Sequence, residues 1–250
     1  MKVINIKNIA IGEKTPKICV SLMGKDKEEI KKQLQQMQNV SFDVLEWRMD
    51  YLDSLNDVVE IAKMIQMYRN DTVLLYTFRT LQEGGEKAIS KAAYINVYKK
   101  LIDYKVCDMI DVEMFMDEEV CHTLCTYAHA FNIYVVGSYH DFNKTPSKKE
   151  LVERFAYMQE KEADVCKIAC MPNNKVDVNT IMQATKQRYI EATTPLIAIS
   201  MGELGKVTRI KGKSFGSALT FGCIHKASAP GQIELEELKQ LLKKEDEVIY

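Results

Sequence analysis

The strongest constraint on the fold of this chain is a repeat in which a short apolar segment is followed by a segment with helical periodicity. The apolar segments are rich in Val, Ile, Leu and Cys and show little strict alternation, which is typical of parallel strands covered by helices. Eight strand and helix units of this kind predict an α/β fold, a (β/α)8 TIM barrel. We expect its strands near residues 17–22, 43–48, 72–79, 107–112, 133–139, 164–169, 195–200 and 217–221.

Helical stripes between these strands support the prediction. Apolar or aromatic residues recur at intervals of three and four in five segments: Val58, Ile61, Ile65 and Tyr68; Tyr94, Val97, Tyr98 and Leu101; Val120, Leu124, Tyr127 and Phe131; Val178, Ile181, Thr185 and Tyr189; and Leu235, Leu238 and Leu242. Residues 203–208 carry only a weak pattern. An open doubly wound sheet is the alternative, but no Gly-rich turn for a dinucleotide or P-loop site follows the first strand.

Residues 1–14 precede the repeat. Apolar residues around Asn8 predict a short β-hairpin there, which we expect to cap one end of the barrel: Val3, Ile4, Ile6, Ile9 and Ile11. The chain has 250 residues, 46% of them hydrophobic, and contains no linker or low-complexity run. This length and composition predict one barrel domain over residues 1–250.

The charge balance favours a small-molecule partner. The chain has 34 basic and 35 acidic residues, mixed along its length, and a formal net charge of −1. We therefore expect no nucleic-acid partner, because no basic stripe is present. The apolar runs have the length of strands, and the amino terminus lacks the long apolar segment of a signal peptide, so we expect no membrane partner and a cytoplasmic location.

The seven cysteines show no spacing typical of disulfides, which fits free thiols in a reducing compartment. The segment Cys121-His122-x-x-Cys125 is the most metal-like one, but it falls on a helical stripe and has no second pair of ligands. We expect no metal centre.

Charged and polar side chains close most of the predicted strands, and a barrel of this kind has its active site at the carboxyl ends of its strands. Single residues have structural explanations: Glu46 and Arg48 could form an ion pair, Glu83 could be a solvated loop acid and His140 a core histidine. Together they favour an active site, because charges at this density cost stability unless they are paired or used. The candidates are Ser21, Glu46, Arg48, Arg79, Glu83, His140, Lys167, Arg209, Ser228 and Gln232.

Lys167 lies in the middle of the predicted strand 164–169. Burial and neighbouring arginines lower the pKa of a lysine amine, which can then form a Schiff base with a ketone. His140 could remove the proton α to the resulting iminium, and Glu83 could orient the imidazole. An arginine fork suits a substrate carboxylate. The residues thus predict a Schiff-base lyase or aldolase that acts on a small anionic hydroxyketone.

The motifs at these positions resemble those of the type I 3-dehydroquinate dehydratases. They include Glu46-Trp47-Arg48-Met49-Asp50, Phe78-Arg79-Thr80 with Glu83-Gly84-Gly85, Ser138-Tyr139-His140-Asp141-Phe142, Ala163-Asp164-Val165-Cys166-Lys167-Ile168-Ala169 and Ala229-Pro230-Gly231-Gln232. The resemblance implies a homodimeric barrel that dehydrates 3-dehydroquinate to 3-dehydroshikimate in the shikimate pathway of aromatic amino acid biosynthesis, without metal or cofactor.

The resemblance also implies roles for the candidate residues. Lys167 would form the Schiff base, His140 would act as general acid and base, and Glu83 would position His140. Arg209 would bind the substrate carboxylate. The carboxylate and ring hydroxyls would further contact Ser21, Glu46, Arg48, Arg79, Ser228 and Gln232, and residues 228–232 would form a lid.

Two alternatives stay open at this level. A class I aldolase acting on a sugar phosphate would favour a backbone phosphate cradle after the last two strands. A barrel that binds a metabolite without turnover would need neither Lys167 nor His140.

Overall fold

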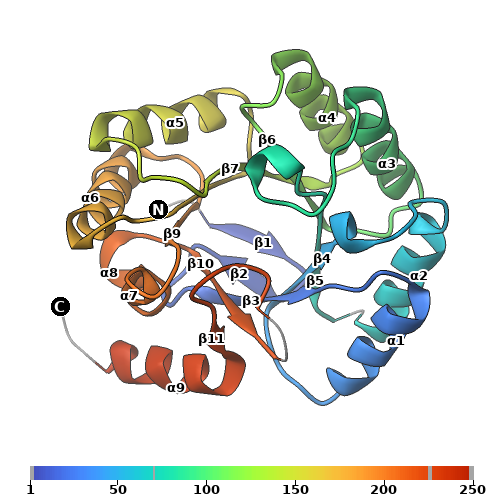
Figure 1. Cartoon of the computed structure of the whole chain (residues 1–250), viewed down its shortest axis with the longest axis horizontal. Coiled ribbons are helices and arrows are strands. Elements are labelled where there is room, and N and C mark those ends of the chain that lie inside the picture. Colours follow the sequence, from blue (N-terminus) through green and yellow to red (C-terminus); the bar gives the residue numbers. More distant parts are fainter. Residues whose placement is uncertain (1–2, 70, 225–226, 248–250) are drawn as a thin grey trace.

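The computed structural model describes residues 3–69, 71–224 and 227–247, and its centre is one curved parallel sheet (Figure 1). The hydrogen-bonded order is β11-β10-β3-β4-β5-β6-β7-β8-β9. The bounds are β3 (Lys17–Leu22), β4 (Val44–Arg48), β5 (Val73–Thr77), β6 (Met109–Glu113), β7 (Tyr134–Asp141), β8 (Val165–Cys170), β9 (Leu196–Ser200), β10 (Leu219–Cys223) and β11 (Ile233–Glu234). Each of the eight predicted strands is confirmed. The two-residue strand β11 is too short to carry a pattern and was not predicted.

The sheet is barrel-like but does not close into the continuous ring that the sequence predicted. Where β9 meets β10, the described residues show one isolated bridge, between Leu196 and Ser217. The backbone nitrogen of Ala218 donates to the carbonyl of Leu196 at 2.7 Å, and the nitrogen of Ala198 donates to Oγ of Ser217 at 3.0 Å. A side-chain hydroxyl thus replaces part of the backbone ladder, and the structure is a nine-stranded parallel sheet rather than a closed barrel of eight strands.

Helices surround the sheet on its outer side (Figure 1). Their bounds are α1 (Lys27–Gln36), α2 (Val58–Tyr68), α3 (Lys91–Asp103), α4 (Glu118–Ala130), α5 (Lys148–Glu160), α6 (Lys175–Glu191), α7 (Lys206–Ile210), α8 (Gly212–Phe215) and α9 (Leu235–Asp246). The predicted stripes pack on the sheet from α2, α3, α4, α6 and α9. The weak pattern near residues 203–208 has a structural reason: the chain there forms two short helices, α7 and α8, in place of one long one.

The predicted hairpin is present as β1 (Ile4–Ile6) and β2 (Ile9–Ile11), which pair antiparallel. Ile6 and Ile11 are buried in a cluster that contains the first residues of β4, β5 and β6, namely Val44, Val73 and Met109. Lys7, in the turn of the hairpin, donates to the carbonyl oxygen of Thr72 and forms an ion pair with Asp108, just before β5 and β6, so the hairpin packs on the amino-terminal ends of the parallel strands.

Helix length and hydropathy are also informative about membranes. Among the residues that the structure describes, no helix combines the length and the apolar character needed to cross a bilayer.

Truncating the hairpin core should destabilise the fold. We expect Ile11→Ala to lower the free energy of unfolding by about 2–5 kcal/mol, because this side chain is 1% exposed and its loss leaves a cavity. Urea unfolding followed by circular dichroism measures the change. The exposed Asn5→Ala in β1 is the matched control, expected to alter stability by no more than about 0.5 kcal/mol. Equal stability of the two variants would contradict the packing of the hairpin on the sheet.

Candidate active site

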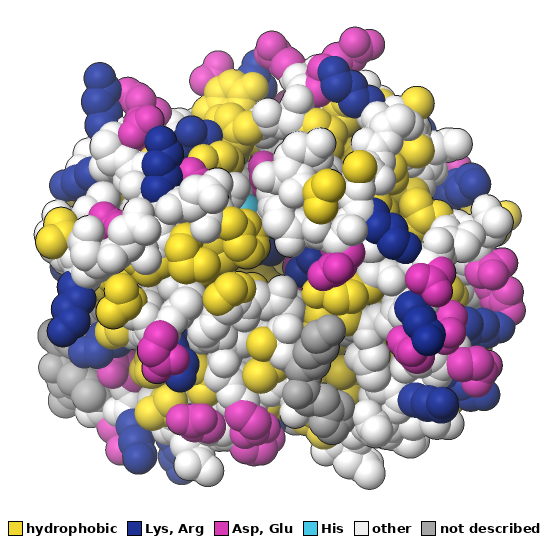
Figure 2. Space-filling model, in the orientation of Figure 1, with side chains coloured by type: hydrophobic (Ala, Val, Ile, Leu, Met, Phe, Trp, Pro, Cys, Tyr) yellow, Lys and Arg dark blue, Asp and Glu magenta, His cyan; other side chains and the backbone are white. Residues whose placement is uncertain are grey.

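The carboxyl ends of the strands enclose a pocket of about 500 Å³. Figure 2 shows a hollow near the middle of the visible face, where a histidine and basic side chains lie between hydrophobic ones. Ser21, the tenth predicted site residue, does not line the pocket but bonds to two residues that do. The other nine predicted residues line it: Glu46, Arg48, Arg79, Glu83, His140, Lys167, Arg209, Ser228 and Gln232.

Lys167 projects from β8 and is 5% exposed. Its Nζ lies 3.2 Å from Oδ2 of Asp111 and 3.5 Å from Oε1 of Glu46, and 4.7 Å from the centre of the Phe221 ring. The sequence predicted arginines beside this amine. That prediction was wrong for its immediate neighbours, because β6 and β4 each present a carboxylate toward it.

His140 lies near the carboxyl end of β7 and is paired with Glu83. Its Nδ1 is 2.9 Å from Oε2 of Glu83, and its backbone nitrogen donates to the same oxygen at 3.0 Å. Burial lowers the pKa of His140 well below its usual range, and Arg79, Lys167 and Arg48 lower it further. With Nδ1 on Glu83, the neutral ring leaves Nε2 to accept a proton from a ligand.

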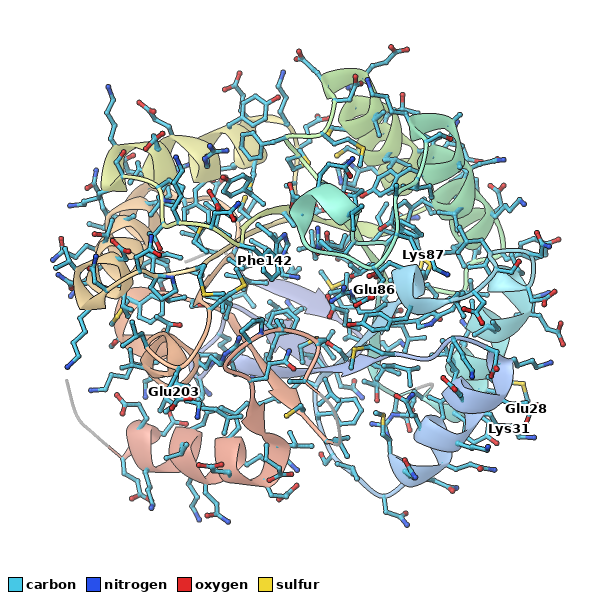
Figure 3. The ribbon with its side chains drawn as sticks, viewed as in Figure 1. Glu28, Lys31, Glu86, Lys87, Phe142 and Glu203 are labelled. Atoms are coloured by element: carbon cyan, nitrogen blue, oxygen red, sulfur yellow. The ribbon has the colours of Figure 1, made fainter. Side chains whose placement is uncertain are left out.

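Glu83 ends the 3₁₀ turn η2 (Leu81–Glu83). Burial raises the pKa of its carboxyl well above the usual range, and the nearby Glu113 raises it further. The turn ends at Gly84, whose φ is +83°. A Cβ there would lie 2.2 Å from the Phe142 ring, so this position requires glycine. Figure 3 places Phe142 and Glu86 on opposite sides of the centre of the molecule.

Arg79 follows β5 and connects the acidic groups of the site. Its guanidinium donates to Asp111 at 2.8 Å and to Glu113 at 2.9 Å, and lies 3.5 Å from Glu83. Burial alone would lower the pKa of Arg79, but Asp111, Glu113 and Glu83 together raise it well above its usual range. Arg79 therefore remains a buried cation that offsets the negative charge of the acids around it.

Three buried acids of the site were not among the residues predicted from the sequence: Asp50, Asp111 and Glu113. Asp111 and Glu113 close β6 in the same way that other polar residues close their strands, so the signal was present in the sequence. Asp50 forms a two-point ion pair with Arg48, at 2.9 Å from Nε and 2.8 Å from Nη2. The ion pair that the sequence suggested between Arg48 and Glu46 is therefore formed between Arg48 and Asp50.

Residues 228–232 lie over the pocket and contact it at several points. Oγ of Ser228 donates to Oγ of Ser21 at 2.8 Å, and Ser21 donates to Oε2 of Glu46 at 2.7 Å. Nε2 of Gln232 donates to Oγ of Ser228 at 2.8 Å. Gly231 has a φ of +76°, and a Cβ there would lie 2.2 Å from the carbonyl oxygen of Gly202. The segment therefore needs glycine at this position to pack on the loop after β9.

Arg209 lies in α7 and is 1% exposed. Its guanidinium donates to the carbonyl oxygens of Pro230 at 3.0 Å and Phe221 at 3.3 Å, and its buried Nε has no partner among the described residues. Burial lowers the pKa of Arg209 to about 10. A buried guanidinium held by carbonyl oxygens suits an anionic ligand such as a carboxylate.

The cysteine and histidine pattern on α4 does not form a metal site. Cys121 and Cys125 lie on the buried face of that helix, and Cys121 Sγ donates to the carbonyl of Glu113. Within residues 3–69, 71–224 and 227–247, no group of three or more His, Cys, Asp or Glu side chains could hold a metal ion.

Comparisons with known proteins agree with one another. The family model described as type I 3-dehydroquinase matches residues 18–248. The chain is 42% identical to the 3-dehydroquinate dehydratase of Clostridioides difficile (strain 630) over 96% of this chain and 95% of that protein. It is also 42% identical to the 3-dehydroquinate dehydratase of Salmonella typhimurium (strain LT2), over 97% of this chain and 98% of that protein.

Solved structures give the same result. A Clostridium difficile type I 3-dehydroquinate dehydratase crystallised with covalent modified comenic acid superposes with a TM-score of 0.95 at 42% identity, covering 99% of both chains. The 3-dehydroquinate dehydratase of Geobacillus kaustophilus superposes with a TM-score of 0.94 at 30% identity, covering 97% of this chain and 96% of that one.

Removing the charge of Arg79 should destabilise the protein. We expect Arg79→Leu to lower the free energy of unfolding by about 3–5 kcal/mol, because it leaves Asp111 and Glu113 buried without their cation. Arg79→Lys keeps a positive charge but loses the planar fork, so we expect a smaller loss. Urea unfolding of both variants measures this difference, and a Leu variant as stable as the Lys variant would refute it.

Proposed function

Because the chain belongs to the type I 3-dehydroquinase family, we propose that it is a lyase that dehydrates 3-dehydroquinate to 3-dehydroshikimate in the shikimate pathway, which leads to the aromatic amino acids. The observation that carries this proposal is the presence of Lys167 and His140 in the lining of one pocket, each held by a buried carboxylate. The sugar-phosphate aldolase and the binding protein without turnover lose support from the family assignment.

In the proposed mechanism, the neutral amine of Lys167 attacks the substrate ketone. A bond forms between Nζ and the carbonyl carbon, and the π electrons of the carbonyl move to oxygen, which takes up a proton. The attacking nitrogen gives up one proton, a second proton is added to the carbinolamine hydroxyl, and water leaves as the nitrogen lone pair forms the C=N bond of the iminium. The resulting iminium is an electron sink, so the proposed chemistry needs neither a metal nor a cofactor.

His140 then acts as base and acid. Nε2 removes the proton α to the iminium, the C–H electron pair forms a C=C bond, and the C=N π electrons move to nitrogen, giving an enamine. The enamine expels the hydroxyl on the next carbon, to which His140 returns the proton so that water leaves. Hydrolysis of the conjugated iminium releases 3-dehydroshikimate and regenerates Lys167. Glu83 keeps the imidazole oriented throughout.

Substrate binding follows from the remaining groups of the pocket. We propose that Arg209 binds the substrate carboxylate, because its buried guanidinium contacts only carbonyl oxygens in the described part of the chain. Ser21, Glu46, Arg48 and Arg79 supply hydrogen bonds to the carboxylate and ring hydroxyls. Ser228 and Gln232 belong to the lid, residues 228–232, which excludes water when it closes.

We propose the domain organisation, the location and the oligomeric state of the protein on the same grounds. Residues 1–250 form one domain with the (β/α)8 arrangement of strands and helices, left open between β9 and β10, and the β1-β2 hairpin caps its amino-terminal end; the packing of Ile6 and Ile11 supports the cap. The enzyme is a cytoplasmic homodimer without a nucleic-acid partner, an inference that rests on the family resemblance and on a net charge of −1.

Chemical trapping tests the Schiff base. Incubation with 3-dehydroquinate and sodium borohydride should add a stable mass that maps to Lys167 by peptide analysis, because reduction converts the imine into a secondary amine. Lys167→Ala should form no adduct and lose turnover. His140→Ala is the matched control and should still form the adduct while turnover fails. Turnover by Lys167→Ala at the native rate would refute the mechanism.

The pH dependence of kcat/KM tests the role of His140. The neutral imidazole is the active base, and activity is lost as pH falls through its pKa. Because burial and three nearby cations lower that pKa below the ordinary value of 6.5, we expect the acidic limb to lie below pH 6.5. Steady-state rates across the acidic range measure the limb, and an inflection above the ordinary value would contradict the assignment.

A further inference from the structure

Asp111 is a buried carboxylate that contacts the nucleophile directly. It lies on β6, is completely buried, and places Oδ2 3.2 Å from Nζ of Lys167. Its other oxygen, Oδ1, accepts from Nη2 of Arg79 at 2.8 Å and from Oγ of Ser138 at 2.6 Å. One oxygen is therefore fixed by two donors, which aims the other at the lysine nitrogen.

The surroundings keep Asp111 ionised. Burial alone would raise its pKa, but Arg79, Lys167 and the hydroxyl of Ser138 together hold the pKa of Asp111 below its usual range. Because the side chain has no access to solvent, its charge acts on Lys167 without screening by water.

Glu46 is the other carboxylate near the same nitrogen, but its position differs. Its Oε1 is 3.5 Å from Nζ and also accepts from Thr77, while its Oε2 accepts from Ser21, which joins it to the lid. Asp111 is closer to the nitrogen, lies deeper, and does not line the pocket. Among the described residues, the charged or titratable groups that interact electrostatically with this nitrogen or its two carboxylates include Cys19, Arg48, Arg79, Glu83, Tyr94, Tyr98 and His140.

Dehydration through a Schiff base requires a positive charge on the imine nitrogen. An imine nitrogen is less basic than an amine, yet only the protonated imine withdraws electrons strongly enough to release the α proton. We propose that Asp111 is the counter-ion of the Lys167 Schiff base and keeps the imine nitrogen protonated during dehydration. This inference rests on the proposed function, because it requires that Lys167 form the imine.

The charge balance follows from the steps of the reaction. The ammonium form of Lys167 and the iminium carry the same single positive charge on the same nitrogen, so the carboxylate of Asp111 faces an unchanged charge once the imine has formed. When His140 takes the α proton, the nitrogen becomes neutral in the enamine. It becomes positive again when the hydroxyl leaves, and Asp111 does not need to gain or lose a proton in either step.

Asp111→Asn tests the proposal, with Glu113→Gln as its matched control. Both acids accept hydrogen bonds from Arg79, but Asp111 alone of the two contacts Nζ. Sodium cyanoborohydride reduces the protonated imine selectively, so adduct yield with 3-dehydroquinate from about pH 6 to about pH 9 reports the protonation of the imine. Thermal unfolding followed by circular dichroism establishes that each variant is folded.

The proposal expects the alkaline loss of adduct to move downward by at least about one pH unit in Asp111→Asn, a tenfold change in proton affinity, while Glu113→Gln follows the native enzyme. An unchanged profile in Asp111→Asn, or an equal shift in both variants, would overturn it. Absence of any adduct from the native enzyme would refute the Schiff base itself, which separates that failure from failure of the counter-ion.

A measurement on the native enzyme covers the case in which Asp111→Asn does not fold. The C=N stretching frequency of the enzyme-bound imine shifts in deuterated water only when the nitrogen carries a proton. A shift that persists to about pH 9 in the Raman spectrum supports the counter-ion, because an isolated imine would have lost its proton. Loss of the shift near neutral pH overturns the proposal.

Discussion

The buried guanidinium of Arg79 is the group on which the rest of the site depends. It forms ion pairs with Asp111, Glu113 and Glu83, and so supplies the positive charge that offsets this cluster of buried acids. Glu83 then holds His140, and Asp111 contacts Lys167. The base and the nucleophile of the proposed reaction are thus positioned through the same side chain, although neither contacts the other's carboxylate.

This network of charged side chains exists because neighbouring parallel strands place residues near their carboxyl ends side by side. Ser21 of β3 pairs with Glu46 of β4, and Lys167 of β8 pairs with Ser138 of β7. Since side chains alternate between the two faces of a strand, every second residue at the carboxyl ends points to the interior. The hairpin β1-β2 packs on the opposite end of the sheet, away from the end where the polar residues gather.

Much of the fold and most of the lining of the site could be predicted. The eight strand ranges and the helical stripes were confirmed because they depend on periodicity within short segments. Nine of the ten candidate residues line the pocket: most of them lie near the carboxyl end of a strand or in the segment that follows it, and Lys167 projects from the middle of β8. Asp111 and Glu113 lie in the second half of β6 but were missed, since no polar residue at the end of this strand was considered as a candidate. The gap between β9 and β10 was missed because a serine side chain replaces ladder hydrogen bonds there, and no periodicity records that.

The sequence by itself determined the order of strands and helices along the chain and the family, and it singled out Lys167 and His140 as candidate reactive side chains. These follow from local patterns and from motifs of consecutive residues. Only the tertiary structure decided which charges pair. Arg79 meets Asp111 across 32 positions of the chain, and Lys167 meets the same acid across 56. Such pairings depend on strand register and on competition between several carboxylates for one buried cation, and neither is a property of neighbouring residues.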